Sequence, residues 1–328
     1  MVGRVALMSG CAILLATMAP TGGARADPAA TPQPSQAQPT GSQAAPTAVS
    51  PLIVTAPEKP QIVRRKVDTF VKGITQQSAF EDNVPRWRTP ICPVVAGFTP
   101  PQGEFLFNRL LQVGAAAGAP LAPPKCDPNL LIVATDHPDQ LMAGLLKSAH
   151  GVFGDSGPSA INRFVRTSRP VRVWYNDVPI DRDGGSVSSD APSAAVQGSG
   201  GGSIIQGVPT TTTYGGSSRL VSATSRGLAL TYVIIDSNRL KGVSIGAVAD
   251  YVSMIALAEV DQDADMSDAS TILRLFSAPA ADAPTSLSDW DSAFLYALYH
   301  TDPNSKLQRS RIASDSASEV TGPHAAAN

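Results

Sequence analysis

The sequence contains few of the residues that most often form metal sites or nucleic-acid-binding surfaces. It has three cysteines and four histidines in 328 residues, and its formal charge is −2. None of the histidines has the spacing of a metal-ligand set; they are His137, His150, His300 and His324. Since the chain also lacks a basic stripe, it is not expected to bind nucleic acid.

The sequence also lacks a strong candidate for a membrane-spanning helix near its start. The apolar run from Val5 to Met18 follows Arg4 and ends before Pro20, so it is too short to span a bilayer well. A positive residue, a short apolar run and the motif Ala24-Arg25-Ala26 are typical of a secretory signal peptide. Residues 1–26 are therefore predicted to be a signal peptide cleaved after Ala26, which leaves no transmembrane segment.

Export affects the charge and the chemistry of the cysteines. The alternative to a signal peptide cleaved after Ala26 is a lipoprotein anchored at Cys11. In either case the protein is expected in the periplasm or cell envelope. Removal of the signal peptide takes away Arg4 and Arg25 and moves the formal charge from −2 to −4. The two remaining cysteines, Cys92 and Cys126, are expected to form a disulfide, with a metal site as the alternative.

Composition divides the mature chain into a compact domain and segments of low complexity. Residues 27–60 are rich in Pro, Ala, Gln and Thr and are predicted to be a disordered linker. Residues 61–85 are predicted to hold a short amphipathic helix and a connection. The compact domain is predicted over residues 86–302, with a flexible Gly/Ser/Thr insert at 183–217 and a disordered tail at 303–328.

Strands and helices alternate in the predicted compact domain. Short apolar runs predict strands over 91–98, 129–135 and 170–178, and helical periodicity follows Pro100 and Pro138. This order predicts an α/β (α+β) fold in which helices pack on a mixed sheet.

The stretch 228–259 is predicted to form the centre of this domain. It begins with a strand that is apolar up to Ile235, and a polar turn follows. Ser244 is then a suitable N-cap for a helix that is apolar on most of its circumference. Such a helix is expected in the core of a protein rather than on its surface.

Several segments of the compact domain carry a recognisable pattern. They are Cys126-x-x-Asn129, the strand Tyr232–Ile235, the helix ending Ala256-Leu257-Ala258, Ser270-Thr-Ile-Leu273, and Leu287-x-x-Trp290-Asp291-x-x-Phe294-Leu295-x-x-Leu298-Tyr299. Together they resemble a poorly characterised family of exported bacterial proteins with a degenerate zincin-like, metalloprotease-related domain. The resemblance covers most of the mature chain and implies a zincin-like fold.

The resemblance also implies that the metal site has been lost. Active zincins carry the motif H-E-x-x-H on the core helix, where the two histidines bind zinc and the glutamate acts as a base. Alignment of Ala256-Leu257-Ala258 with the Ala-Leu-Gly that follows this motif places Tyr251, Val252 and Ile255 at the His, Glu and His positions. Tyrosine is a weak zinc ligand, and the side chains of valine and isoleucine have no lone pair to donate to a metal. Zinc binding is therefore not expected, and no other cofactor is predicted.

An acidic loop follows the core helix. Asp261, Asp263 and Asp265 alternate along it, and carboxylates at this spacing can bind calcium. However, the loop lacks the glycine and the glutamate that an EF-hand requires at its sixth and twelfth positions. A solvated acidic loop is the favoured interpretation, with weak calcium binding as the alternative.

Two functions of different classes are consistent with these observations. The first is a non-catalytic binding or accessory module of the periplasm or cell envelope, whose ligand or partner protein is unknown. The second is a peptidase-like hydrolase with an unrecognised active site, which could use Asp250, Ser253 or the acidic loop. The missing zinc ligands favour the binding module.

Overall fold

The computed structural model describes residues 58–75, 83–148, 150–154, 156–182 and 220–322. The predicted signal peptide with its cleavage site at Ala26, nearly all of the predicted linker and the predicted Gly/Ser/Thr insert lie outside these residues.

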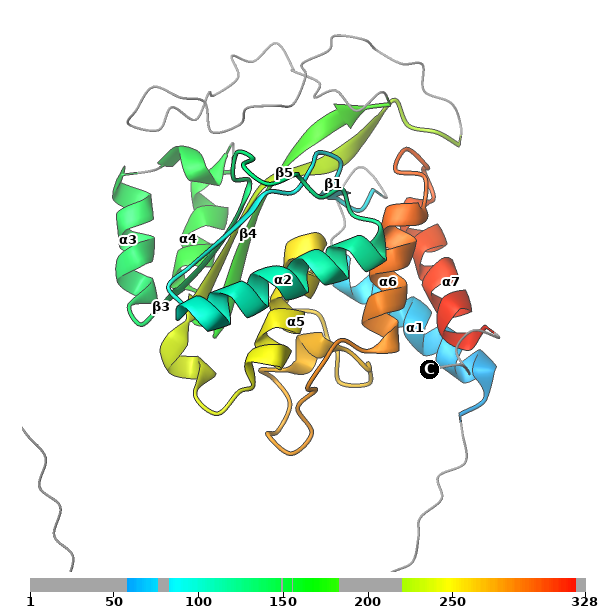
Figure 1. Cartoon of the computed structure of the whole chain (residues 1–328). Helices are drawn as coiled ribbons and strands as arrows, with labels where there is room; N and C mark the ends of the chain where they lie inside the picture. The colour runs from blue at the N-terminus through cyan, green and yellow to red at the C-terminus, as the bar shows by residue number, and fades with distance from the viewer. Residues whose placement is uncertain (1–57, 76–82, 149, 155, 183–219, 323–328) are drawn as a thin grey trace, which may run out of the picture. The chain divides into compact units, whose positions relative to one another are not determined.

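A single sheet forms the framework of the described fold (Figure 1). Its strands are β1 (Arg86–Trp87), β2 (Pro93–Ala96), β3 (Leu130–Thr135), β4 (Val171–Asp181) and β5 (Thr224–Asp236). The strands β2, β3 and β5 lie side by side and run parallel, and β1 pairs in parallel with the start of β5. The strand β4 pairs antiparallel with the other side of β5. The predicted α/β class with a mixed sheet is therefore confirmed.

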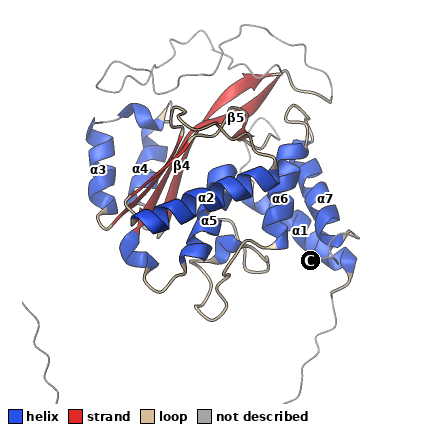
Figure 2. Ribbon diagram, viewed as in Figure 1, coloured by secondary structure: helices blue, strands red, loops and turns tan. Residues whose placement is uncertain are grey.

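Helices cover both faces of the sheet, as Figure 2 shows. They are α1 (Pro60–Ile74), α2 (Pro100–Ala117), α3 (Pro138–Ser148), α4 (Pro158–Arg166), α5 (Ile245–Leu257), α6 (Asp289–His300) and α7 (Gln308–Thr321). Short 3-10 turns occur at His150–Phe153, Ser237–Leu240 and Ile272–Arg274. Side chains of α3 and α4 form a smaller core with Trp174 and Ile234 on one face of the sheet, and the other helices belong to the main core.

Local capping contacts explain where several of these helices begin. The hydroxyl of Ser244 accepts a hydrogen bond from the amide of Ala247 at 3.2 Å, so the predicted N-cap of α5 is confirmed. Ser288 and Asp291 form a capping box at the start of α6. The helix α2 begins at Pro100 and ends at Gly118, whose φ of 79° suits a residue without a Cβ.

The prediction of a disordered tail at 303–328 was wrong, because α7 lies within it. Its residues Ile312 and Ala313 are fully buried, and the helix packs along α1. Val67 and Val71 of α1 are equally buried in the main core. The compact fold therefore extends beyond residues 86–302 at both ends. Sequence reasoning missed α7 because its apolar row is narrow and lies among serine and charged residues.

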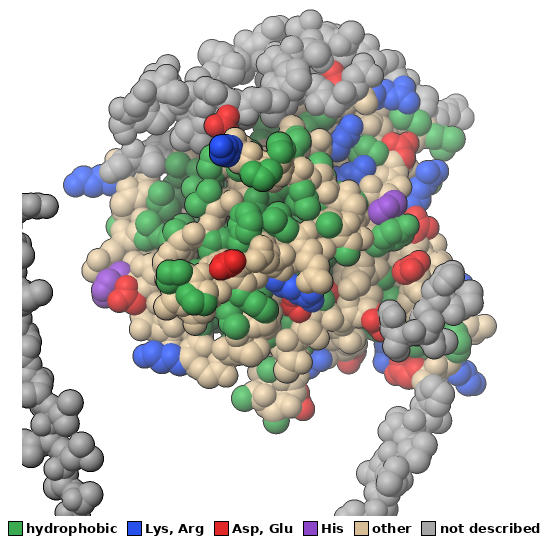
Figure 3. Space-filling view, viewed as in Figure 1, with side chains coloured by type: hydrophobic (Ala, Val, Ile, Leu, Met, Phe, Trp, Pro, Cys, Tyr) green, Lys and Arg blue, Asp and Glu red, His purple; other side chains and the backbone are tan. Residues whose placement is uncertain are grey.

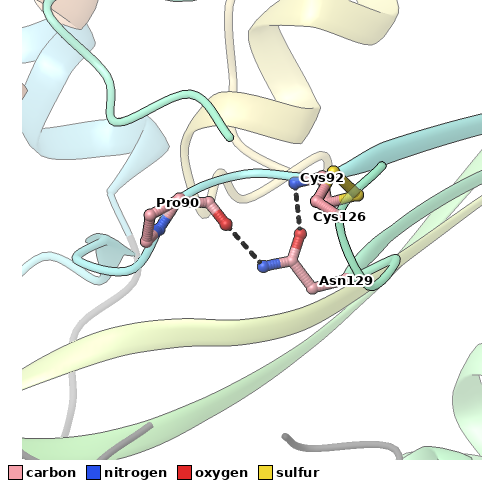
Figure 4. Close-up of a disulfide and its surroundings, with 4 residues drawn as sticks. All are labelled: Pro90, Cys92, Cys126 and Asn129. Carbon is pink, nitrogen blue, oxygen red and sulfur yellow. Dashed lines mark hydrogen bonds between the residues drawn. A yellow bond between two sulfur atoms is a disulfide. The ribbon is translucent and has the colours of Figure 1, made fainter. Parts of the chain in front are cut away.

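The predicted disulfide between Cys92 and Cys126 is confirmed, with a Cα–Cα distance of 5.9 Å (Figure 4). Asn129 supports the same corner of the fold. Its Oδ1 accepts from the amide of Cys92 at 2.7 Å, and its Nδ2 donates to the carbonyl oxygen of Pro90 at 3.0 Å. The motif Cys126-x-x-Asn129 therefore fastens the segment before β2 to the entry of β3. Within the described residues, no helix is both long and apolar enough to cross a membrane.

Candidate functional site

The three positions that the resemblance aligns with zinc-binding residues are all buried in the core. Val252 and Ile255 are fully buried, and Tyr251 is nearly so. The hydroxyl of Tyr251 accepts a hydrogen bond from Nε2 of Gln262 at 2.9 Å, and its ring packs edge-on against Phe276. These side chains therefore stabilise packing and offer no set of metal ligands.

The C-terminal end of α5 is held by three aromatic side chains from other parts of the chain. Tyr175 donates to the carbonyl oxygen of Ile255, Trp87 to that of Ala256 and Tyr299 to that of Leu257, at 2.8, 2.8 and 2.6 Å. The last carbonyls of a helix have no partner within the helix. A helix that ends inside the core needs such donors, which explains how α5 can end there.

The residues considered for a hydrolase are occupied by structural contacts. Asp250 is 3% exposed, and both its oxygens bind the guanidinium of Arg109, at 2.5 and 3.2 Å. One of these oxygens also accepts from the amide of Leu287 at 2.9 Å. Ser253 is fully buried, and its hydroxyl donates to the carbonyl oxygen of Ala249. Neither residue is placed to act on a substrate.

The acidic loop does not gather its carboxylates around a common point. Asp261 accepts from the amide of Asp263 at 2.8 Å, and Asp265 accepts from the amide of Ser267 at 3.0 Å. The carboxylate of Asp263 forms an ion pair with Arg169. No group of three or more acidic, cysteine or histidine residues in the described part of the chain could hold a metal ion.

The structure instead brings several elements together around a cavity of about 710 Å³. The segment 259–263, which follows α5, lines it together with α4, β4 and the end of α1. Its lining residues include Val173 and Tyr175 of β4, the guanidinium-bearing residues Arg163 and Arg172, and Glu259. Sequence reasoning predicted neither α4 nor this cavity.

Glu259 is the most unusual polar residue of this cavity. It is 6% exposed, and its Oε2 is buried without a hydrogen-bond partner among the described residues. Burial raises the pKa of this carboxyl to about 7, against the effect of Arg226, while Asp177 adds to the increase. A carboxyl group with such a pKa in a cavity is a candidate for a functional role. An acidic residue directly after an apolar core helix was the signal that could have indicated it.

A second cavity, of about 550 Å³, adjoins the first. Arg169, Gln262 and Asp263 line both, and Arg169 contacts the side chains of the other two. Tyr251 and Phe276 form part of its wall. Arg169 and its two partners therefore separate the two cavities.

The opposite edge of the sheet carries an apolar surface. Val94 of β2 is 40% exposed and Phe105 of α2 is 46% exposed. Figure 3 shows hydrophobic side chains gathered on the face that α2 crosses. The groove between β2 and α2 has a volume of about 390 Å³ and contains few polar groups apart from Glu104.

The chain was compared with protein-family models, curated proteins and solved structures. It matches none of them. The resemblance to a degenerate zincin-like domain therefore stays a prediction.

Proposed function

We propose that this protein is a non-catalytic binding module of the cell envelope that binds an extended peptide along the free edge of β4. The observation that carries this proposal is that no other described strand pairs with the outer side of β4, whose residues Val173 and Tyr175 line the cavity of about 710 Å³. Peptides commonly bind by adding a strand to an exposed sheet edge, where backbone hydrogen bonds supply affinity and adjacent pockets supply specificity.

The register of β4 on β5 defines which backbone amide and carbonyl groups of β4 point away from β5. The amide of Asp236 donates to the carbonyl oxygen of Pro170 at 2.9 Å, so these opposed residues form a hydrogen-bonded pair. Because such pairs alternate in antiparallel strands, Val171, Val173 and Tyr175 direct their amide and carbonyl groups away from β5. The contact from Gln262 Nε2 to the carbonyl oxygen of Val171, at 3.3 Å, agrees with this alternation.

The cavity offers space beside this edge. Val173 and Tyr175 both line it, and among the described residues no further strand pairs with β4. Its volume lies within the range of ordinary ligand sites. The walls formed by α4 and by the segment after α5 could then contact the side chains of an added strand.

The two other parts of the proposal have separate support. The non-catalytic role is supported by the packing of Tyr251, Val252 and Ile255 and by the structural contacts of Asp250 and Ser253. Location in the envelope is supported by the disulfide, which is common in exported proteins and rare in the cytosol. These observations favour an exported protein that binds rather than cleaves.

The proposal is tested by fluorescence anisotropy with labelled seven-residue peptides rich in threonine and valine. The wild-type protein is expected to bind them, and Val173→Pro is expected to weaken binding about tenfold or more, because it removes an outward amide and adds a ring at the edge. Proline at this position leaves the hydrogen bonds to β5 in place. Val173→Ala is the matched control and should bind as the wild type does.

A second control uses the peptide and does not depend on the folding of a variant. Methylation of alternate backbone nitrogens of the peptide blocks strand addition and should abolish binding to the wild-type protein. Equal binding of methylated and unmethylated peptides, or the absence of binding by any peptide of the set, would contradict the proposal.

A further inference from the structure

The neighbours of Glu259 leave its buried oxygen without a donor. The hydroxyl of Tyr175, a residue of the same cavity, donates to the carbonyl oxygen of Ile255 and accepts from the amide of Val260 at 3.4 Å. Nε of Arg226 donates to Asp177 at 2.5 Å. Oε2 of Glu259 therefore has no hydrogen-bond partner in the described part of the chain, although a buried polar group normally has one.

The surroundings of Glu259 favour a positive charge. The residue follows α5 by two positions, and the C-terminal end of a helix carries partial negative charge that attracts cations. Asp177 raises the pKa of Glu259, although Arg226, its ion-pair partner, has a larger effect in the opposite direction. A donor that carries a positive charge would therefore satisfy the oxygen better than a neutral donor.

We propose that Glu259 makes the site selective for a peptide with a basic side chain, lysine or arginine, which enters the cavity beside Tyr175 and donates to the Glu259 carboxylate. This inference rests on the proposed binding of a peptide at β4. It adds a specificity-determining residue to a site whose backbone contacts alone would not distinguish side chains.

The other charged groups of the cavity leave this position open to a cation. Arg172 is paired with Asp139, Arg169 with Asp263, and Lys72 with Asp68. Arg163 lines the wall from α4, and Arg226 of β5 is paired with Asp177 and lowers the pKa of Glu259 through its charge. No histidine is among the described residues that line the cavity. Glu259 is therefore the group expected to determine how binding depends on pH near neutrality.

The experiment compares two sets of the labelled seven-residue peptides described above. One set carries a single lysine at each position in turn, and the other carries norleucine, which has a similar length and no charge. At pH 8 the lysine peptide with the best placement is expected to bind about tenfold more tightly than its norleucine counterpart. Because the pKa of Glu259 is about 7, this preference should shrink at pH 6, where the carboxyl is mostly protonated.

The variants assign the preference to one carboxyl group. Glu259→Gln is expected to lose the preference for lysine, so that it binds lysine and norleucine peptides equally well. Asp261→Asn is the matched control, since Asp261 lines the same cavity, and it should keep the preference.

The outcomes separate this inference from the proposed function. If norleucine peptides bind and lysine adds nothing at any position, the role of Glu259 is disproved and peptide binding at β4 stands. Retention of the preference by Glu259→Gln would equally disprove that role. If no peptide of either set binds, both proposals fail.

Discussion

At the scale of single residues, Glu259 links burial to the dependence of stability on pH. Burial raises its pKa from 4.5 to about 7, so between these values the folded protein binds more protons than the unfolded chain. Its contribution to stability is therefore fully present below pH 4.5 and is lost as the pH rises through 7. A pKa shift of this size lowers the free energy of unfolding by roughly 3 kcal/mol as the pH rises from 4.5 to 7.

Replacement of Glu259 with glutamine should remove this dependence. We expect Glu259→Gln to be more stable than the wild type at pH 8, by up to roughly 3 kcal/mol, with the difference largely gone at pH 5. Urea denaturation of both proteins at pH 5, 6, 7 and 8 measures it. A difference that is constant over this range would show that Glu259 keeps an ordinary pKa in the folded protein.

Asp250 illustrates how a carboxylate in the core can be purely structural. Its two oxygens accept from the guanidinium of Arg109 and from the amide of Leu287. The hydrogen bond that Arg109 donates to Asp250 raises the pKa of Arg109, against the effect of desolvation. A buried charge with partners on both oxygens ties α2 and the segment before α6 to α5, whereas Glu259 has an oxygen without a partner.

At the scale of secondary-structure elements, α1 and α7 complete the main core. They come from opposite ends of the described chain and lie against each other. Val67, Val71 and Ile312 have no exposed surface. The side chain of Arg64 also donates to the hydroxyl of Ser318 at 2.5 Å. Burial of this kind requires both helices, because neither could hide its apolar row alone.

The contribution of α7 can be measured with Ile312→Ala. We expect a loss of about 2–5 kcal/mol in the free energy of unfolding, since the substitution leaves a cavity at a fully buried position. Arg311→Ala, one position earlier and exposed, is the control and should change stability by less than about 0.5 kcal/mol. Similar effects of the two substitutions in urea denaturation would show that α7 does not pack as described.

At the scale of the whole molecule, the three positions that the zincin resemblance would align with metal ligands lie on a packed core helix. The helix α5 follows β5, and every residue from Ala247 to Leu257 is buried. The cavity lies beside the C-terminal end of this helix, and β4 forms its rim.

The scaffold is therefore expected to be stable without metal. Mass spectrometry of the purified protein should find far less than one zinc ion per chain. Dialysis against EDTA should leave Tm unchanged, because Tyr251, Val252 and Ile255 stabilise the core through packing. Addition of calcium after dialysis tests the acidic loop in the same experiment. Zinc bound at about one ion per chain and lost with a specific substitution would contradict the proposed loss of the metal site.

The sequence by itself determined features that depend on neighbouring residues. Strand β3, the N-cap at Ser244 and the capping box of Ser288 and Asp291 could be predicted, because they depend on apolar periodicity and on hydrogen bonds within one turn. The pairing of Cys92 with Cys126 followed from there being two cysteines in the predicted mature chain. The packing role of Tyr251, Val252 and Ile255 could be inferred from side chains that are poor zinc ligands.

Only the tertiary structure decided the candidate site. The donors to the end of α5 come from residues as far away as Trp87, 169 positions before the carbonyl that it binds. The free edge of β4 depends on its register with β5, and the pKa of Glu259 depends on burial by elements distant in the sequence. The packing of α7 likewise requires α1. Desolvation and strand pairing arise from contacts between distant segments, so residue order alone could not reveal them.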